Sequence, residues 1–436
     1  MTAVAPRRLR TGAVVALGFV VAGGAFWNFC RQAPSAREGA DARIAFYEAR
    51  LGGRATYPAY TGLGLAYLQK ARETGIPRYF DDAKRYLLES QRRQLNYEAL
   101  KGLAAVHLAL HEFHEALAAA EEAVKTRPAD PEAVGALFDA HLALGEDGKA
   151  ERVFDTLRSQ SPGFLTESRL SNLEEYRGRL AEARDAMLRA CADAERARLP
   201  SATRAWCRVR LGALFVTTCE PARAEREYRE ALGLFPDYYL AREHLAELAA
   251  AQGRIAEAIA WYEGLLRTNP GPHYTLALTD LEAATSGDDR AAAVRAAALT
   301  ALRDSAESGH RADWRTLALH LLEDDATVDE GLRWAERDWD NRRDSFAADT
   351  LAWAFHRRGR LTEAGTLVTR MLEPGTRAPT MLLHAAEIAL AAGRPSAAAA
   401  LLQRLPRCPE ALAPSDQATA ARLRREGPQS RLDSPP

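Results

Sequence analysis

Residues 205–236 read AWCRVRLGALFVTTCEPARAEREYREALGLFP, and residues 239–270 read YLAREHLAELAAAQGRIAEAIAWYEGLLRTNP. The second stretch repeats the pattern of the first after 34 positions, and the same spacing occurs elsewhere in the chain. The pairs 34 positions apart include Leu211 and Leu245, Ala224 and Ala258, Tyr228 and Tyr262, Pro236 and Pro270, Pro128 and Pro162, Ala116 and Ala150, and Ala364 and Ala398. A fixed period of this length predicts stacked copies of one supersecondary unit rather than a single globular core.

Each copy is predicted to be a helical hairpin. Within each half of a copy, apolar residues fall three or four positions apart, as on a helix with one buried face. Gly253 can take the left-handed conformation that ends the first helix. Pro270 ends the second helix, because proline lacks a donor N–H and clashes with the preceding turn. Gly212 and Ala224 are small, which allows the two helices of a hairpin to cross closely.

On these residues the chain resembles the tetratricopeptide repeat (TPR) family. The matching residues are Leu211, Gly212, Phe215, Ala224, Tyr228, Ala231 and Pro236, with their counterparts in neighbouring copies. Ser171 and Phe138 depart from the family, which usually has Gly or Ala there, and His107 and His141 stand where it usually has Tyr. As a whole, the chain resembles long exported bacterial proteins of this family. The resemblance implies an all-α fold, a right-handed TPR-type α-solenoid of about ten helix hairpins.

The spacing is irregular in three places. The 74 residues from Pro162 to Pro236 are two periods plus six, and the surplus is expected within ERARLPSATR at 195–204. The 106 residues from Ala258 to Ala364 are three periods plus four, which predicts two degenerate units, around 278–302 and 317–334. In the first copy, from Tyr57, the segment RETGIPRYFD at 72–81 is expected to lengthen the turn.

These patterns divide the chain into six segments. A basic terminus (1–11) and an apolar segment (12–29) precede a linker and leading helix (30–56). An N-terminal array (57–270) is followed by a C-terminal array (271–405) whose first units are degenerate, with a rigid joint at Asn269-Pro270-Gly271-Pro272 between two superhelical segments. The tail (406–436) is rich in Pro, Ser and Arg with few apolar residues, so it is expected to be disordered.

The segment 12–29, GAVVALGFVVAGGAFWNF, carries no charge and follows Arg7, Arg8 and Arg10. As a helix it would be about 27 Å long, enough to span a bilayer core. The arginines should stay in the cytoplasm, which places the repeats on the periplasmic side of the inner membrane behind a single-pass anchor. A cleaved signal peptide is the alternative, since Gly23-Gly24-Ala25 offers a weak cleavage site, and the mature protein would then be periplasmic or secreted. A lipid anchor on Cys30 is disfavoured by the bulky residues before it.

Cysteine and histidine spacing leaves two weaker hypotheses. The five cysteines do not form a framework in a chain of 436 residues. Cys191 and Cys207 could form a disulfide between consecutive units, but separate buried thiols are favoured. His107, His111 and His114 have a spacing that can place metal ligands on one helix face. Because the helix should end near His111, His114 should start the next helix, and ordinary packing is the favoured interpretation.

No motif predicts an enzyme. The chain has no phosphate-binding loop, dinucleotide fingerprint or nucleophile elbow, and no strand pattern to carry one. The acidic run EDDATVDE at 323–330 lacks the ligand register of a calcium loop. The formal net charge of −1 gives no global field that would attract nucleic acid. We therefore expect no catalytic centre, no cofactor and no bound metal.

The family resemblance places the binding surface on the first helix of each hairpin, which lines the concave groove. The residues expected to point into this groove are Lys101, Asp139, Asn172, Glu243, Glu247, Asp349 and Trp353. Trp353 could anchor a partner or could pack against a neighbouring helix. Acidic residues outnumber basic ones in this set, which favours a basic or mixed protein or peptide partner. The leading hypothesis is a membrane-anchored extracytoplasmic scaffold, and the alternative is an accessory subunit of an envelope transport, secretion or assembly complex.

Overall fold

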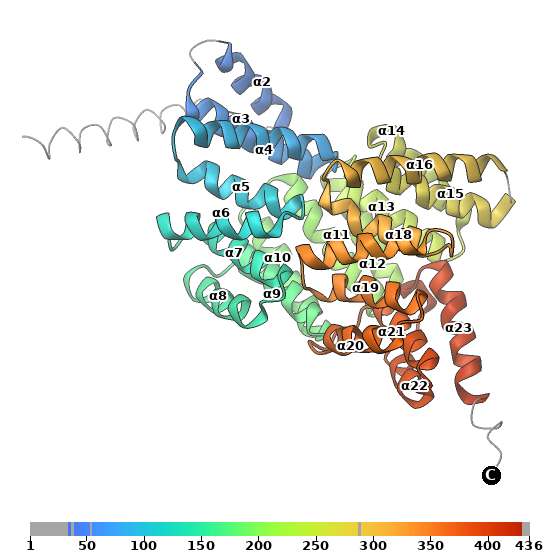
Figure 1. The fold of residues 1–436 in the computed structure, drawn as a ribbon. Helices are drawn as coiled ribbons and strands as arrows, with labels where there is room; N and C mark the ends of the chain where they lie inside the picture. Colours follow the sequence, from blue (N-terminus) through green and yellow to red (C-terminus); the bar gives the residue numbers. More distant parts are fainter. Residues whose placement is uncertain (1–33, 36–38, 53–54, 287–288, 430–436) are drawn as a thin grey trace, which may run out of the picture.

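The computed structural model describes residues 34–35, 39–52, 55–286 and 289–429, and all the regular elements among them are helices (Figure 1). Twenty of these helices form ten successive hairpins. They are α3 (Tyr57–Thr74) with α4 (Pro77–Arg93), α5 (Tyr97–Ala109) with α6 (Phe113–Thr126), α7 (Pro131–Ala143) with α8 (Asp147–Gln160), α9 (Phe164–Tyr176) with α10 (Leu180–Arg196), α11 (Ser201–Thr217) with α12 (Pro221–Leu234), α13 (Tyr239–Ala251) with α14 (Ile255–Thr268), α15 (Pro272–Ser286) with α16 (Asp289–Glu307), α17 (Trp314–Leu321) with α18 (Val328–Asn341), α19 (Ser345–Arg357) with α20 (Leu361–Leu372), and α21 (Pro379–Ala391) with α22 (Pro395–Gln403). The predicted all-α solenoid of about ten hairpins is confirmed.

Two further helices flank the hairpins. Helix α2 (Ala40–Leu51) precedes them and α23 (Pro414–Gln429) follows them, while the short 3-10 helices η2 (Arg311–Asp313) and η3 (Pro409–Ala411) lie in connecting loops. None of the helices described is long and apolar enough to cross a bilayer. The predicted basic terminus and membrane segment, residues 1–11 and 12–29, lie outside the described residues.

Close helix crossing holds each hairpin together, as the small residues predicted. A Cβ added at Gly212 would lie 2.3 Å from the ring of Tyr228, and one at Gly64 would lie 2.6 Å from Leu87. Both distances are shorter than any contact that side chains tolerate, so only glycine allows this approach of the two helices. Tyr228 and Leu87 are in turn fully buried.

The irregular spacings lengthen helices rather than turns. The expectation of a longer turn in the first hairpin is wrong: its turn is only Gly75-Ile76, while α3 has 18 residues and α4 has 17. The surplus at 195–204 similarly extends α10 and α11, each 17 residues long. Both degenerate units between Pro270 and Asp344 are complete hairpins, α15/α16 and α17/α18.

The expected disordered tail is wrong for residues up to 429. Helix α23 packs on α21 and α22, and buries Ala420 and Leu423. Thr380 donates a hydrogen bond to Asp416, and Arg422 pairs with Glu387, so α23 contacts α21 as the first helix of another unit would. A helix at the end of a solenoid has one buried face and an otherwise polar surface. Its composition therefore resembles that of a disordered segment.

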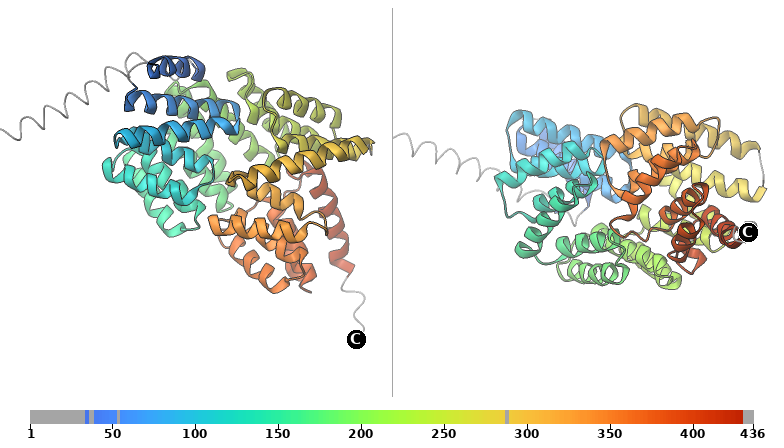
Figure 2. Two further views of the ribbon diagram at one scale, coloured as in Figure 1. Left: turned by 45° about the horizontal axis from the view of Figure 1, so that its top comes forward. Right: turned by 60° about the horizontal axis from the view of Figure 1, so that its bottom comes forward.

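The solenoid coils until its later hairpins lie against its earlier ones (Figure 2). We call the hairpins from α3/α4 to α13/α14 the first coil, and those from α15/α16 to α21/α22 with α23 the second coil. The hairpin turns of the first coil meet loops and helix ends that follow about 165 to 230 residues later. We call this contact zone the seam. Its residue pairs are Thr74 with Asn269, Asp81 with His310, Glu115 with Arg311, His111 with Asn341, Ala143 with Arg343, Gly178 with Gly375, Cys219 with Cys408, and Ala251 with Gln417.

The predicted joint at residues 269–272 begins in the seam. The Asn269 side chain is buried and donates a hydrogen bond from Nδ2 to the Thr74 carbonyl at 3.2 Å. The first helices of the flanking hairpins, α13 and α15, contact each other less closely than those of most neighbouring hairpins. Asn269, the first residue of the predicted joint, is thus fixed to the first coil, while α14 and α15 pack on each other across residues 269–272 through a shared apolar cluster.

Glycine is favoured at the hairpin turns for two separable reasons. Gly178 and Gly359 have φ of 72° and 70°, in the left-handed region that costs other residues about 1–2 kcal/mol. A Cβ at Gly178 would also lie 2.1 Å from the Gly375 carbonyl oxygen across the seam, whereas one at Gly359 would meet no atom within 4 Å. Gly359 is therefore a matched control for the seam contact of Gly178.

We expect Gly359→Ala to lower the free energy of unfolding by about 1 kcal/mol, the backbone cost alone. Gly178→Ala should lower it by more, because the seam must also open to admit the methyl group. Urea unfolding followed by circular dichroism measures both. Equal losses in the two variants would show that the seam is not formed at Gly178.

Candidate functional site

The first helices of the hairpins form the inner face of the solenoid. Successive first helices pack against one another, as α3 does with α5, α5 with α7, α7 with α9, α11 with α13, and α19 with α21, whereas successive second helices are farther apart. The side on which neighbouring helices lie closer is the concave side of a coil. The groove residues predicted from the sequence all lie on these first helices.

Most of the predicted groove residues are paired with the next first helix. Lys101 on α5 lies 2.9 Å from Glu132 on α7, and Asp139 on α7 lies 2.7 Å from Arg169 on α9. Asn172 on α9 accepts a 3.3 Å hydrogen bond from Arg210 on α11, which also pairs with Glu175 at 2.5 Å. These pairs are partly exposed, so each contributes about 1 kcal/mol or less to stability. They tie neighbouring hairpins together along the inner face.

Glu243 and Glu247 on α13 differ from this pattern. Glu243 accepts a hydrogen bond from the Tyr274 hydroxyl at 3.4 Å, and Glu247 pairs with His244 at 2.7 Å. Neither is within ion-pair distance of a described lysine or arginine. Burial, followed by repulsion from Glu247, raises the pKa of Glu243 to about 7. The inner face therefore carries two carboxylates without a strong cationic partner at α13.

Arg72 at the end of α3 reaches the same enclosed space. The Arg72 side chain keeps contact with solvent, but many protein atoms lie around it, and their desolvating effect lowers its pKa. The nearby carboxylate of Glu132 acts in the opposite direction and raises the pKa. The aromatic rings of Tyr238 and Tyr239 lie close by, and that of Tyr239 packs against Gly75. The inner face at this point combines aromatic rings with charges of both signs.

Asp349 and Trp353 are not free groove residues. Asp349 is fully buried, 2.9 Å from His384 on α21 and 3.7 Å from Arg315 on α17. The ring of Trp353 stacks on His384 with centroids 4.3 Å apart. The prediction that Asp349 points into the groove is wrong, because its carboxylate bridges three neighbouring first helices. Trp353 follows the alternative interpretation, packing against the neighbouring helix.

The three histidines of the metal hypothesis do not form a common site. The His107 Nδ1 lies 2.5 Å from the Glu112 Oε2, so a carboxylate that the sequence analysis overlooked holds this ring in place. His111 occupies the left-handed position after α5, at φ 56°, and its carbonyl accepts a hydrogen bond from Asn341 across the seam. His114 is exposed at the start of α6, where the spacing placed it. The described residues contain no group of three potential metal ligands.

The pairing of His107 is repeated one period later. His141 lies 2.6 Å from Glu146, and both residues stand 34 positions after their counterparts. For Glu112, burial opposes ionisation, but hydrogen bonds from His107 and Lys84 outweigh it and lower the pKa to about 2. The histidines at the positions where related repeats usually have Tyr thus fix the start of the second helix.

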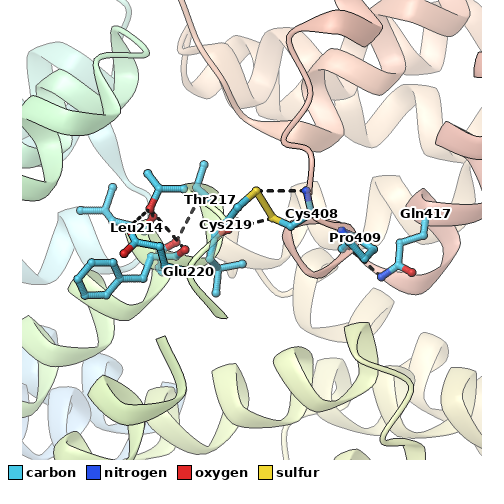
Figure 3. The surroundings of a disulfide bond; sticks show 11 residues. Leu214, Thr217, Cys219, Glu220, Cys408, Pro409 and Gln417 are labelled. Carbon is cyan, nitrogen blue, oxygen red and sulfur yellow. Dashed lines mark hydrogen bonds between the residues drawn. A yellow bond between two sulfur atoms is a disulfide. The ribbon is translucent and has the colours of Figure 1, made fainter. Parts of the chain in front are cut away.

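Sequence reasoning missed the partners of the groove residues and one disulfide. The predicted carboxylates and amide are held in place by Arg169, Arg210, Arg315 and His384. The sequence feature that could have predicted these ion pairs is the presence of opposite charges 30 to 35 positions apart. Cys191 and Cys207 are separate buried thiols, as favoured. Cys219 and Cys408 form a disulfide across the seam (Figure 3).

Comparison with known proteins identifies the repeats. Two profiles described as tetratricopeptide repeat match residues 107–173 and 210–271. This chain is a tetratricopeptide repeat protein. The matches cover the clean copies, and the hairpins between and beyond them continue the same TPR architecture. A search of the curated proteins gave no match.

Several solved TPR-like structures are similar at low identity. Yeast Tom70 shares 12% identity, with 86% of this chain and 97% of that chain covered and a TM-score of 0.34. PilW, a type IV pilus biogenesis factor, shares 18%, with 48% and 92% covered and a TM-score of 0.38. A human IFIT1 dimer with PPP-AAAA shares 13%, with 76% and 77% covered and a TM-score of 0.46. Similarity this distant says nothing about what the TPR array binds here.

The His384–Asp349 pair makes stability depend on pH. Burial opposes the charge of His384, but the carboxylates of Asp349 and Asp416 outweigh burial and the repulsion from Arg315, so its pKa is raised. A histidine with a raised folded pKa stabilises the fold fully below its unfolded value of about 6.5, and the contribution is lost as pH rises through the folded value.

We expect His384→Gln to lower the urea midpoint at pH 6 more than at pH 9, because only the charged ring pairs with Asp349. The measurement is urea unfolding at both pH values. His114→Gln, at the exposed histidine of α6, serves as the control and should keep the wild-type pH dependence. Equal effects of His384→Gln at both pH values would show that His384 is not charged in the folded protein.

Proposed function

We propose that this protein is a membrane-anchored, extracytoplasmic TPR scaffold that binds a protein or peptide segment on its inner face, without catalysis of its own. The inner face supports the binding part of this proposal. Polar and aromatic side chains lie on its successive first helices, and at α13 they include Glu243 and Glu247, which have no lysine or arginine partner. The apolar segment 12–29 after three arginines supports the anchor.

The Cys219–Cys408 disulfide is the observation that carries the location. Disulfides persist in oxidising compartments such as the periplasm and are rare in the reducing cytosol. The bond joins residues 189 positions apart, so it also stabilises the fold by limiting the unfolded chain, by about 5 kcal/mol in the chain-entropy treatment. A TPR array exported behind the segment 12–29 would form this bond on the far side of the membrane.

The charge on the inner face selects the partner. Its carboxylates outnumber its cations, and those with a cationic partner within the array are already neutralised. The carboxylates of this face are Glu98, Asp130, Glu132, Asp139, Glu175, Glu243 and Glu247, and the cations are Arg72, Lys101, Arg169 and Arg210. A segment carrying lysine or arginine would gain most at α13, where it displaces no lysine or arginine and competes only with His244 for Glu247.

We expect Glu243→Gln with Glu247→Gln to weaken partner binding about tenfold, equivalent to roughly 1.4 kcal/mol. Partners are captured by a photo-crosslinking residue at position 247 in intact cells, with position 95 on the exposed α4–α5 loop as the negative site. The charge control is Glu121→Gln with Glu263→Gln, two exposed carboxylates on the second helices α6 and α14. Crosslinking at 95 but not at 247 would overturn the inner-face proposal.

The location has its own test. In cells treated with a membrane-permeant alkylating agent, Cys219 and Cys408 should stay unmodified unless a reductant is added first, because both are in a disulfide. The protein should sediment with membranes and resist extraction by carbonate if residues 12–29 remain attached. Release into the soluble periplasmic fraction would replace the anchor with a cleaved signal, and alkylation of both cysteines without reductant would place the repeats in a reducing compartment.

A further inference from the structure

The seam is held almost entirely by polar contacts. The largest buried apolar cluster of the described residues contains only residues 276–423, and the others contain only residues 44–281. Apart from the step α13–α14–α15, where the chain itself is continuous, no apolar cluster found among the described residues joins the two coils. Apolar burial is the main favourable term that holds protein surfaces together. Apolar burial therefore stabilises each coil separately but does not hold the two coils against each other.

The ion pairs across the seam are partly exposed, whereas the two asparagines that bond across it, Asn269 and Asn341, are buried. The His310–Asp81 and Arg311–Glu115 pairs have side chains between 26% and 50% exposed, and pairs of this kind contribute about 1 kcal/mol or less. A depression of about 530 Å³ opens between the coils beside Gly145, Tyr176 and Arg343. The seam is thus not apolar, and its close contacts at Gly145 and Gly178 leave this depression open beside them.

The disulfide lies near the end of the seam that is farthest along the chain from the joint, and only the Ala251–Gln417 contact lies beyond it. Cys408 follows the last hairpin, and the η3 turn after it contacts α11 and α13. The Cys408 N–H donates to the Cys219 Sγ at 3.2 Å (Figure 3). The Gln417 side chain donates to the Ala251 carbonyl at 2.9 Å. The continuous chain connects the coils at residues 269–272, and the disulfide is the one covalent connection between them elsewhere in the described chain. The second coil is therefore covalently attached near both ends only while the disulfide is intact.

Cys219 also occupies a position that disfavours cysteine. It is the left-handed residue after α11, at φ 64°, where six other hairpins have glycine at φ between 68° and 73°. A non-glycine residue there costs about 1–2 kcal/mol. Strain of this kind persists where another requirement outweighs it. Here the bond to Cys408 is such a requirement, because the hairpin turn faces the seam. His111, the non-glycine residue at the turn after α5, also contacts the second coil, through Asn341.

We propose that the Cys219–Cys408 disulfide is a redox-controlled lock on the superhelix. While it is oxidised, the second coil stays stacked on the first. A dithiol reductant attacks one sulfur, the mixed disulfide resolves through its second thiol, and Cys219 and Cys408 gain two electrons and two protons as the reductant becomes a disulfide. Both sulfurs belong to half-buried residues, within reach of such a thiol. The coils then part along the seam about the joint, which opens the inner face from the side.

This consequence for partner access rests on the proposed function, but the opening itself does not, so it is measured without a partner. The probe is hydrogen exchange by mass spectrometry on the full-length protein in detergent, oxidised and then treated with dithiothreitol. The Arg343 amide is the reporter, because its hydrogen bond to the Ala143 carbonyl exists only while the coils are stacked. We expect peptides covering residues 341–345 to exchange about tenfold faster after reduction.

Peptides from α11 and α12 around the buried Leu211 and Tyr228 are the control for global unfolding and should not change. Cys219→Gly with Cys408→Ser gives the unlocked state without strain at position 219, and dithiothreitol should have no further effect on it. Unchanged exchange at 341–345 after complete reduction, or equally faster exchange at Leu211, would overturn the lock. If this variant fails to fold, reduction of the wild-type protein still decides the question.

Discussion

The close approach of the two helices within each hairpin is the constraint on which the rest of the structure depends. Glycine or alanine at the crossing lets a large neighbour, such as Tyr228 over Gly212, fill the adjacent space. A hairpin closed in this way still has an apolar face that it cannot bury alone, so it must stack on the next hairpin. Because every step repeats a similar offset, the stack curves, and the curvature creates both an inner face and a second coil.

Curvature also explains why the seam joins such distant residues. The short turns of all hairpins lie along one edge of a solenoid, and the loops between hairpins lie along the other. When the coil completes a revolution, the turn edge of the first coil meets the loop edge of the second. The contact between Gly178 and Gly375, 197 positions apart, is close to six periods of 34. The seam thus follows from the pitch of the array, and specific side chains decide only how firmly it is held.

Because the seam follows from the pitch of the whole array, the local sequence pattern predicts the hairpins but not the contacts across the seam. Hairpins and their small residues depend on local periodicity, so the ten units and the packing at Gly212 follow from the residues alone. The Cys219–Cys408 bond depends on the pitch summed over five hairpins, which no local pattern contains. Helix α23 was mistaken for a disordered tail because a terminal helix needs few apolar residues. Lengthened helices at α3 and α4 were mistaken for a long turn, since a count of residues does not show which element absorbs a surplus.

The same distinction applies to the inner face. Register along each first helix predicts Lys101, Asp139 and Glu247 on the side facing away from the hairpin core, but it does not show that neighbouring helices neutralise most of the charges on the predicted groove residues. Asp349 is the extreme case, because its neighbours bury it completely. A partner that binds such a surface must exchange internal ion pairs for new ones, which yields specificity with little net affinity. Of the predicted groove carboxylates on the described inner face, Glu243 and Glu247 on α13 have no lysine or arginine partner, and Glu247 pairs only with His244, so a cationic partner would meet the least competition there.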